Sequence, residues 1–286
     1  MRPPFEIQGN GVLAGESSVI DLALPKLNSH TRLSMPVHIV HGKKDGPRLF
    51  VSAAVHGDEL NGVEIVRRLL EVKALRRLAG TLVAVPVVNV YGLIHQSRYL
   101  PDRRDLNRCF PGSPAGSLAA RVAHLLVDEI LRHCTHGIDL HTGAIHRTNL
   151  PQIRANLDDP ETERLARAFG VPVLLNSTLR DGSLRASAAE LGMPMLLYEA
   201  GEGLRFDEVA IRAGLNGVLN VMRALGMLPR SRHHTREGAP FMARSSHWTR
   251  APESGLLRTL VPLGAQVRSG ELLGYISDPY TGTQPP

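Results

Sequence analysis

The chain has 286 residues, of which 43% are hydrophobic and 21% charged, and this composition fits a soluble globular protein rather than extended disorder. No stretch approaches the roughly 18 to 20 apolar residues that span a bilayer, and the N-terminus MRPPFEIQGN lacks the pattern of a signal peptide. The two cysteines, Cys109 and Cys134, do not indicate a disulfide framework. We therefore expect a cytoplasmic protein with no membrane partner.

The formal net charge is +6, and a basic balance can indicate a nucleic-acid partner. Here the arginines are dispersed and aromatic residues make up only 4% of the chain. We find no helix-turn-helix or ribonucleoprotein-type motif. An anionic small molecule is therefore the expected partner, and nucleic acid is not.

Strand-like and helical patterns alternate along the first 230 residues. Apolar runs typical of strands cover residues 34–42, 48–56, 81–90, 137–141, 171–176 and 193–200. Helical periodicity covers about 60–78, 117–134 and 207–226. This alternation predicts an α/β domain whose central sheet is mostly parallel or mixed, with helices on both faces.

The pattern changes near residues 229–240, which read as a linker, and beyond them short strands alternate with glycine turns. This segment is similar to half of a barrel-sandwich module of the biotinyl or lipoyl type. It cannot be a carrier, because no lysine follows Lys73. We predict a catalytic α/β domain with N-terminal strands over residues 1–230 and a linker with a small all-β module over 231–286. That module is either a lid or assembly surface near the site, or a stabilising appendage with no catalytic part. A homo-oligomer is one of the expected states of the chain.

Two of the expected strands end in residues that suit a metal ion. His56 follows one apolar strand and Glu59 comes three residues later, while His141 closes another strand in IDLHTG. Because ligands gather at the carboxyl ends of strands in open α/β sheets, these side chains can converge. Two imidazoles and one carboxylate suit zinc, with a fourth position open for water. Taken singly, His141 reads as an ordinary hydrogen-bonded histidine and Glu59 as a favourable first-turn acid, but their conjunction favours a metal site.

Four motifs occur in the order AVHGDELNG, SRYLPDRRDLNRCFPG, IDLHTG and YEAGEG. Together they resemble the succinylglutamate desuccinylase/aspartoacylase family over roughly residues 35–225. The resemblance implies a zinc-carboxypeptidase-like fold and one Zn²⁺ per chain. It matches His56, Glu59 and His141 to the family's zinc ligands, the same three residues that the strand ends indicate.

Amide hydrolysis also needs a group that takes a proton from water and passes it to the departing amine. The stretch MLLYEAGEG offers Glu199 and Glu202. Glu199 directly follows an apolar strand, and the resemblance matches it to the family's catalytic glutamate. Glu202 is the second candidate, and a strand-end acid without a catalytic role is the plain alternative for Glu199.

The connection QSRYLPDRRDLNRCF holds four arginines, and a guanidinium binds a carboxylate through two parallel hydrogen bonds. The resemblance implies that Arg98 helps to hold the scissile carbonyl and its oxyanion. It implies that Asn107 and Arg108 grip a substrate carboxylate. Because this chain carries the extra residues PDRR between these positions, Arg103 or Arg104 is an alternative to Arg98.

The sequence therefore predicts a zinc-dependent hydrolase, specifically a deacylase or amidohydrolase. Its expected substrate is an N-acyl amino acid or a similar small N-acylated, carboxylate-bearing compound. A zinc carboxypeptidase acting on short peptides would use the same atoms. A non-catalytic protein that binds zinc and carboxylates is the alternative of another class.

Overall fold

The computed structural model describes residues 2–27, 29–230 and 239–280. Contacts divide the chain into two compact units, Met1–Arg244 and Ser245–Pro286. The expected linker falls largely on residues 231–238, outside the described residues, so the domain boundary at residue 230 stays a prediction. Within the described ranges, no helix is both long enough and apolar enough to cross a membrane.

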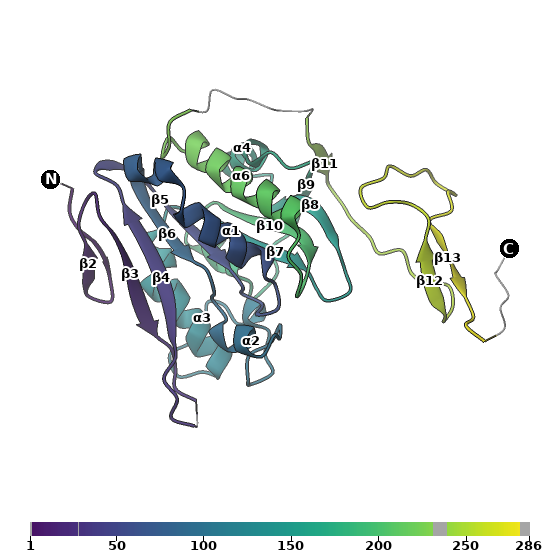
Figure 1. Ribbon diagram of the computed structural model, residues 1–286, viewed down its shortest axis with the longest axis horizontal. Coiled ribbons are helices and arrows are strands. Elements are labelled where there is room, and N and C mark those ends of the chain that lie inside the picture. Colours follow the sequence, from purple (N-terminus) through teal and green to yellow (C-terminus); the bar gives the residue numbers. More distant parts are fainter. Residues whose placement is uncertain (1, 28, 231–238, 281–286) are drawn as a thin grey trace. The chain divides into compact units, whose positions relative to one another are not determined.

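A mixed sheet of nine strands forms the centre of the larger unit (Figure 1), in the order β11-β9-β8-β10-β7-β5-β6-β4-β3. Strands β10, β7, β5 and β6 run parallel to one another, and β8, β9 and β11 form a second parallel group. The β8–β10, β4–β6 and β3–β4 pairs are antiparallel. The strands are β3 (Ser17–Ala23), β4 (Ser34–His41), β5 (Lys44–Ala53), β6 (Ala79–Val85), β7 (His136–Gly143), β8 (Asn149–Ala155), β9 (Val173–Asn176), β10 (Met195–Glu202) and β11 (Phe241–Ala243).

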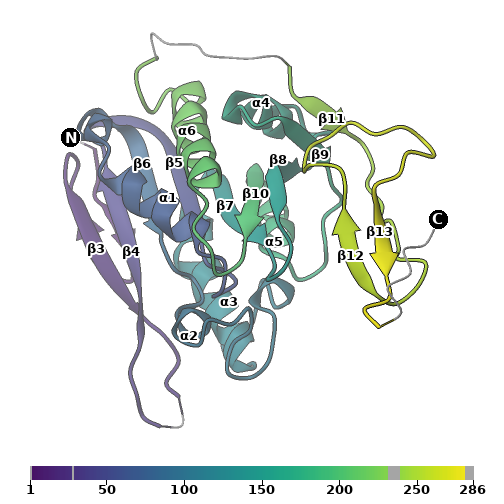
Figure 2. The ribbon, with the colours of Figure 1, turned by 45° about the vertical axis from the view of Figure 1, so that its right-hand side comes forward.

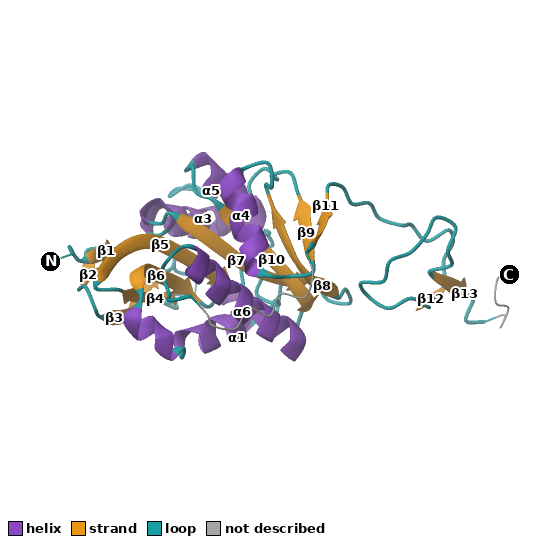
Figure 3. Ribbon diagram, turned by 90° about the horizontal axis from the view of Figure 1, so that it is seen from above, coloured by secondary structure: helices purple, strands orange, loops and turns teal. Residues whose placement is uncertain are grey.

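Helices cover both faces of this sheet, as the alternating pattern predicted. Figure 3 shows α1 (Asn61–Leu70) and α6 (Glu208–Ala224) on one side, and α3 (Leu118–Glu129) and α5 (Leu184–Glu190) on the other. Side chains that alternate along the strands enter separate apolar clusters. Leu49 and Val51 of β5 pack with α1, α6 and α4 (Pro160–Phe169), while Phe50 packs with α3 and α5.

Several expected elements are shorter than their sequence patterns. The periodicity over 60–78 contains α1 and a separate 3-10 turn, η1 (Lys73–Arg77), because the chain is extended at Val72. The apolar run 81–90 ends as a strand at Val85, and its last residue begins α2 (Val90–Ile94). Similarly, α3 is followed by the 3-10 turn η3 (Leu131–His133).

The sequence patterns gave no bounds for several strands, some at the N-terminus and one inside the sheet. A small hairpin of β1 (Phe5–Ile7) and β2 (Asn10–Val12) precedes β3, and β8 lies inside the sheet beside β10. In Figure 2, β7, β10 and β8 are neighbours, which agrees with their pairing. The carboxyl ends of β5, β7 and β10 therefore meet at one edge of the sheet.

In the smaller unit, the described residues 245–280 form one antiparallel pair, β12 (Leu256–Thr259) with β13 (Gly274–Ser277). Most of its large apolar side chains are exposed, while Ile276 is buried. The small β module expected at the C-terminus is thus present, and its role stays a prediction.

Candidate metal and catalytic site

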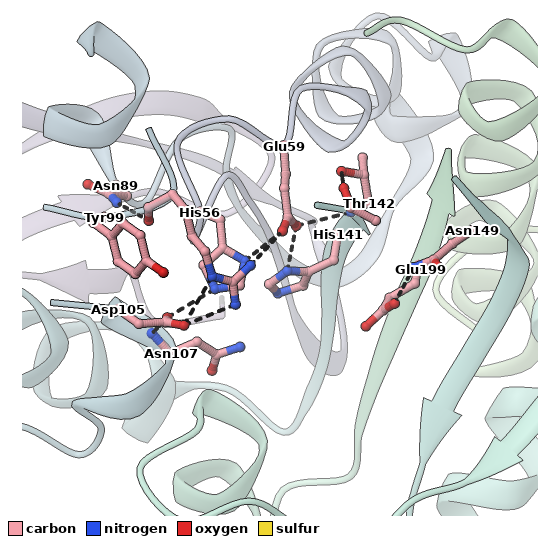
Figure 4. Close-up of polar contacts among 12 residues, drawn as sticks. His56, Glu59, Asn89, Tyr99, Asp105, Asn107, His141, Thr142, Asn149 and Glu199 are labelled. Carbon is pink, nitrogen blue, oxygen red and sulfur yellow. Dashed lines mark hydrogen bonds and ion pairs between the residues drawn. The ribbon is translucent and has the colours of Figure 1, made fainter. Parts of the chain in front are cut away.

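His56 and Glu59 lie in the tight turn between β5 and α1. The N–H of Glu59 donates to the main-chain oxygen of His56 at 3.1 Å, and this turn aims both side chains at the same space (Figure 4). Gly57 is required here because a Cβ would lie only 2.0 Å from the carbonyl carbon of Gly92 in α2. Close packing of the turn against α2 therefore fixes the two side chains.

His141 reaches the same point from the end of β7. Its Nδ1 lies 2.7 Å from Glu59 Oε2, and His56 Nδ1 lies 2.7 Å from Glu59 Oε1. The N–H of Thr142 also donates to Glu59 Oε2, at 3.0 Å. All three side chains of the triad His56, Glu59 and His141 are buried, and their ligand atoms lie within 4.8 Å of one another. The structure thus brings together the three residues that the strand ends indicated.

A carboxylate holds the outer nitrogen of each imidazole. His141 Nε2 lies 2.7 Å from Asp139 Oδ2, and His56 Nε2 lies 3.1 Å from Asp105 Oδ1. Asp139 is fully buried and also accepts a hydrogen bond from the hydroxyl of Ser52 at 2.7 Å. Such outer carboxylates are the usual partners of metal-binding histidines. They leave the two Nδ1 atoms facing Glu59, and this donor set fits zinc.

The charges of the triad stabilise one another, because carboxylates surround both imidazoles. Burial acts to lower the pKa of His56, but the charge of Glu59 and the hydrogen bonds to its neighbours outweigh burial and raise that pKa. At His141, burial also acts to lower the pKa, but Asp139 and Glu59 outweigh it and raise the pKa well above its usual value. The pKa of Glu59 is lowered despite burial because both imidazoles stabilise its charge.

Arg98 is the arginine of the long connection that contacts this cluster. Its Nη1 lies 3.3 Å from Glu59 Oε1, and its Nε and Nη2 donate to Asp105 Oδ2 at 3.2 and 3.0 Å. Its main-chain oxygen accepts a hydrogen bond from the side-chain amide of Asn89 at 3.4 Å. Arg103 and Arg104 are exposed. The geometry therefore favours Arg98 over the two alternatives.

Asn107 and Arg108 lie on the short 3-10 turn η2 (Leu106–Arg108), and their surroundings differ. The side chain of Asn107 is buried, and its Oδ1 accepts the N–H of Leu184 at 2.9 Å. In Figure 4 its amide lies beside the site, below Asp105. Arg108 is exposed and its guanidinium donates to the main-chain oxygen of Asn107. Asn107 thus stands at the site and Arg108 at the surface.

Glu199 stands next to His141 because the two residues are register partners on the parallel strands β10 and β7. Its Oε2 accepts a hydrogen bond from the side-chain amide of Asn149 at 2.5 Å, and its Oε1 lies 3.5 Å from Arg154 Nε. Glu202 follows an irregularity in the register and accepts hydrogen bonds from the His146 N–H and the Thr148 hydroxyl. Of the two candidate bases, Glu199 is the one in register with a triad residue, and Figure 4 shows it on the His141 side of the site.

Sequence reasoning left out several polar residues at this site. Asp105 directly precedes Leu106–Arg108 in the DLNR motif, and this position was the available signal that it belongs to the site. Asn149 and Arg154 come from β8, which no pattern indicated. Arg185, from α5, is buried and interacts electrostatically with Glu199 and Asp139. These contacts depend on which strands and helices are neighbours.

Comparisons with known proteins agree with this architecture. Residues 45–225 match the succinylglutamate desuccinylase/aspartoacylase catalytic domain. N-alpha-acetyl-L-2,4-diaminobutyric acid deacetylase from Halomonas elongata is 26% identical over 270 residues, which cover 90% of this chain and 79% of the relative.

Solved structures share the fold over most of the chain. A succinylglutamate desuccinylase/aspartoacylase from Rhodobacter sphaeroides has a TM-score of 0.80 and 26% identity, over 92% of this chain and 83% of that one. The product-bound structure of an ectoine utilization protein from Ruegeria pomeroyi has a TM-score of 0.82 and 22% identity. The match covers 100% of this chain and 88% of that one. Since the family match spans more than half of its residues, this chain belongs to the succinylglutamate desuccinylase/aspartoacylase family.

Proposed function

We propose that this protein is a zinc-dependent hydrolase that cleaves the amide bond of an N-acyl amino acid or a similar small N-acylated compound. The observation that carries the proposal is the buried triad, on which two imidazole nitrogens and one carboxylate converge, with Glu199 in register beside His141. The family match supports a deacylase-type hydrolase. The name of the Halomonas relative, a deacetylase of an acetylated diamino acid, supports an N-acylated amino acid as the substrate.

His56, Glu59 and His141 would hold one Zn²⁺, because the chemistry of this donor set and the carboxylates behind both imidazoles fit that ion. When bound, zinc supplies Lewis-acid chemistry, which makes water more acidic and an acyl carbonyl more electrophilic. A carboxypeptidase would place the same residues around a peptide bond, and substrate testing separates the two activities.

Glu199 acts as the general base and then as the general acid in this proposal. Its carboxylate takes the proton of the attacking water and hands it to the departing amine nitrogen. The Asn149 amide and the Arg154 guanidinium hold its two oxygens from the β8 side. Glu199 therefore has a fixed orientation at the edge of the sheet where the triad lies.

The remaining groups bind and orient the substrate. Arg98, which reaches the triad through Glu59, stabilises the negative charge that develops on the carbonyl oxygen. Asn107 at the site and Arg108 at the nearby surface hold a carboxylate of the substrate, with the guanidinium supplying the charge. This arrangement predicts a preference for substrates that carry a free carboxylate close to the scissile amide.

The test is the release of free amine from a panel of N-acetyl amino acids, N-succinyl amino acids and short peptides. Each substrate is measured with the protein as purified, after a chelator, and after zinc is added back. We expect release from an N-acyl amino acid that disappears with the chelator and returns with zinc. Release from peptides alone would favour a carboxypeptidase, and no release by a zinc-loaded protein would favour a binding protein.

A further inference from the structure

The carboxylate of Asp105 joins three parts of the site through its two oxygens. Its Oδ1 lies 3.1 Å from His56 Nε2 and accepts the N–H of Asn107 at 2.9 Å. Its Oδ2 accepts hydrogen bonds from Nε and Nη2 of Arg98 at 3.2 and 3.0 Å. The side chain is only 16% exposed. We propose that Asp105 is a positioning residue that sets a zinc ligand and the oxyanion-binding arginine in one arrangement, an inference that rests on the proposed function.

The contact with His56 determines which nitrogen of that ring is available to a metal. A neutral imidazole carries its proton on one nitrogen and its lone pair on the other. If Nε2–H donates to Asp105, the lone pair is on Nδ1, which faces Glu59 Oε1 at 2.7 Å. Asp139 performs the same task for His141 from two residues away on the same strand, whereas Asp105 reaches His56 from a loop 49 residues later in the chain.

The contact with Arg98 keeps that guanidinium from pairing with Glu59 alone. Arg98 approaches Glu59 through Nη1 only, at 3.3 Å, whereas Nε and Nη2 both bond to Asp105. Without the Asp105 carboxylate, Arg98 would keep its hydrogen bond to Glu59 and its weaker electrostatic interaction with Asp58. Arg98 would then compete with a cation for the carboxylate of Glu59.

The experiment measures the zinc dissociation constant of metal-free protein by competition with a chromophoric chelator. Wild type is compared with Asp105→Ala, Asp105→Asn and the control Asp102→Asn. Asp102 lies in the same loop, but among the described residues its carboxylate accepts hydrogen bonds from the N–H groups of Arg104 and Ala119 and from no residue of the triad. We expect Asp105→Ala to weaken zinc binding about 10- to 100-fold and Asp102→Asn to leave it unchanged.

Asp105→Asn separates the two tasks of the residue. Its amide oxygen can still accept from His56 and from the Asn107 N–H, but its NH₂ group faces Arg98, which is also a donor. We expect zinc binding to weaken by about 10-fold, the lower end of the range for such partners. If the wild type hydrolyses a substrate, we expect a fall in kcat in this variant that the control does not show.

Circular dichroism and thermal unfolding establish that each variant is folded. A folded Asp105→Ala with wild-type zinc affinity overturns the inference and leaves the proposed function standing. If the alanine variant does not fold, an unchanged zinc dissociation constant in Asp105→Asn overturns it instead. A wild type that binds zinc without hydrolysing any substrate overturns the proposed activity alone, and one that binds no zinc overturns both.

Discussion

Two acids near the end of β10, Glu199 and Glu202, have different surroundings, and this decides which of them is available for chemistry. Glu199 pairs in register with His141, whereas Glu202 lies beyond a register irregularity and holds the loop that contains His146 and Thr148. Gly201 between them has a φ of +72°, a conformation that L-residues with side chains rarely adopt. The irregularity of β10 at Gly201 thus separates the candidate base Glu199 from Glu202, which binds a neighbouring loop.

Replacement of Glu199 by glutamine tests this assignment. We expect Glu199→Gln to lower kcat about 10²- to 10⁴-fold, the range of a general acid–base residue, and to leave zinc binding intact because Glu199 is not part of the triad. The measurements are amine release under saturating substrate and the zinc content of the purified protein.

Glu202→Gln is the matched control, since it removes a charge three residues away on the same strand. We expect it to retain most of the turnover. Near-normal rates in Glu199→Gln, or an equal loss in Glu202→Gln, would show that the base has been assigned to the wrong residue.

At the scale of elements, the sequence located the three strands that carry the site to within a few residues, but it did not show which strands are neighbours. Apolar runs that end in polar residues locate His56, His141 and Glu199, because period and polarity are local properties of the chain. Asn149 and Arg154 lie on β8, whose sequence NLPQIRA is polar and contains a proline. Asp105 acts through contacts with distant residues. Such pairings depend on tertiary packing, which a single sequence pattern does not report.

Helix α4 offers a test of how local sequence sets an element. Asp159 caps it, and its Oδ2 accepts hydrogen bonds from the N–H and hydroxyl of Thr162 at 2.7 and 2.6 Å. We expect Asp159→Ala to lower the free energy of unfolding by about 1 kcal/mol. Glu163→Ala, on the same helix but without a capping bond, should lower it by roughly 0.3 kcal/mol. Urea denaturation of both variants measures the difference.

The effect of this cap on stability should not change between pH 7 and pH 5. Hydrogen bonds from Thr162 lower the pKa of Asp159 in the folded state. A lowered carboxyl pKa gives stability that is present above the unfolded value of about 4 and is lost as the pH falls toward the folded value. A difference between wild type and Asp159→Ala that shrinks between pH 7 and pH 5 would contradict this account.

At the scale of the whole molecule, the nine-stranded sheet and the candidate site both lie in the first compact unit, Met1–Arg244. Both large apolar clusters lie within residues 5–242, as do the triad and Glu199. In the second unit, Leu256, Leu257 and Leu263 are each more than half exposed, and an isolated pair of strands adds little stability of its own.

We therefore expect a variant that ends at Arg244 to unfold cooperatively near the wild-type temperature and to bind zinc with wild-type affinity. Calorimetry and chelator competition provide the two measurements. A truncated protein that aggregates or loses zinc would assign the C-terminal module a structural role. Loss of turnover with zinc binding intact would favour its role as a lid or assembly surface.

The triad joins chain segments that are far apart, since His56 and Glu59 follow β5 while His141 ends β7. The unfolded chain therefore has no preformed metal site. Zinc bound by the triad would stabilise the folded state, because it binds that state and not the unfolded chain. At a free zinc concentration one hundred times the dissociation constant, zinc binding adds about 2.7 kcal/mol to the free energy of unfolding. The melting temperature should rise with the logarithm of the zinc concentration, and His141→Ala should remove most of that rise. Release of the metal and unfolding of the sheet would then be thermodynamically coupled, so that each promotes the other.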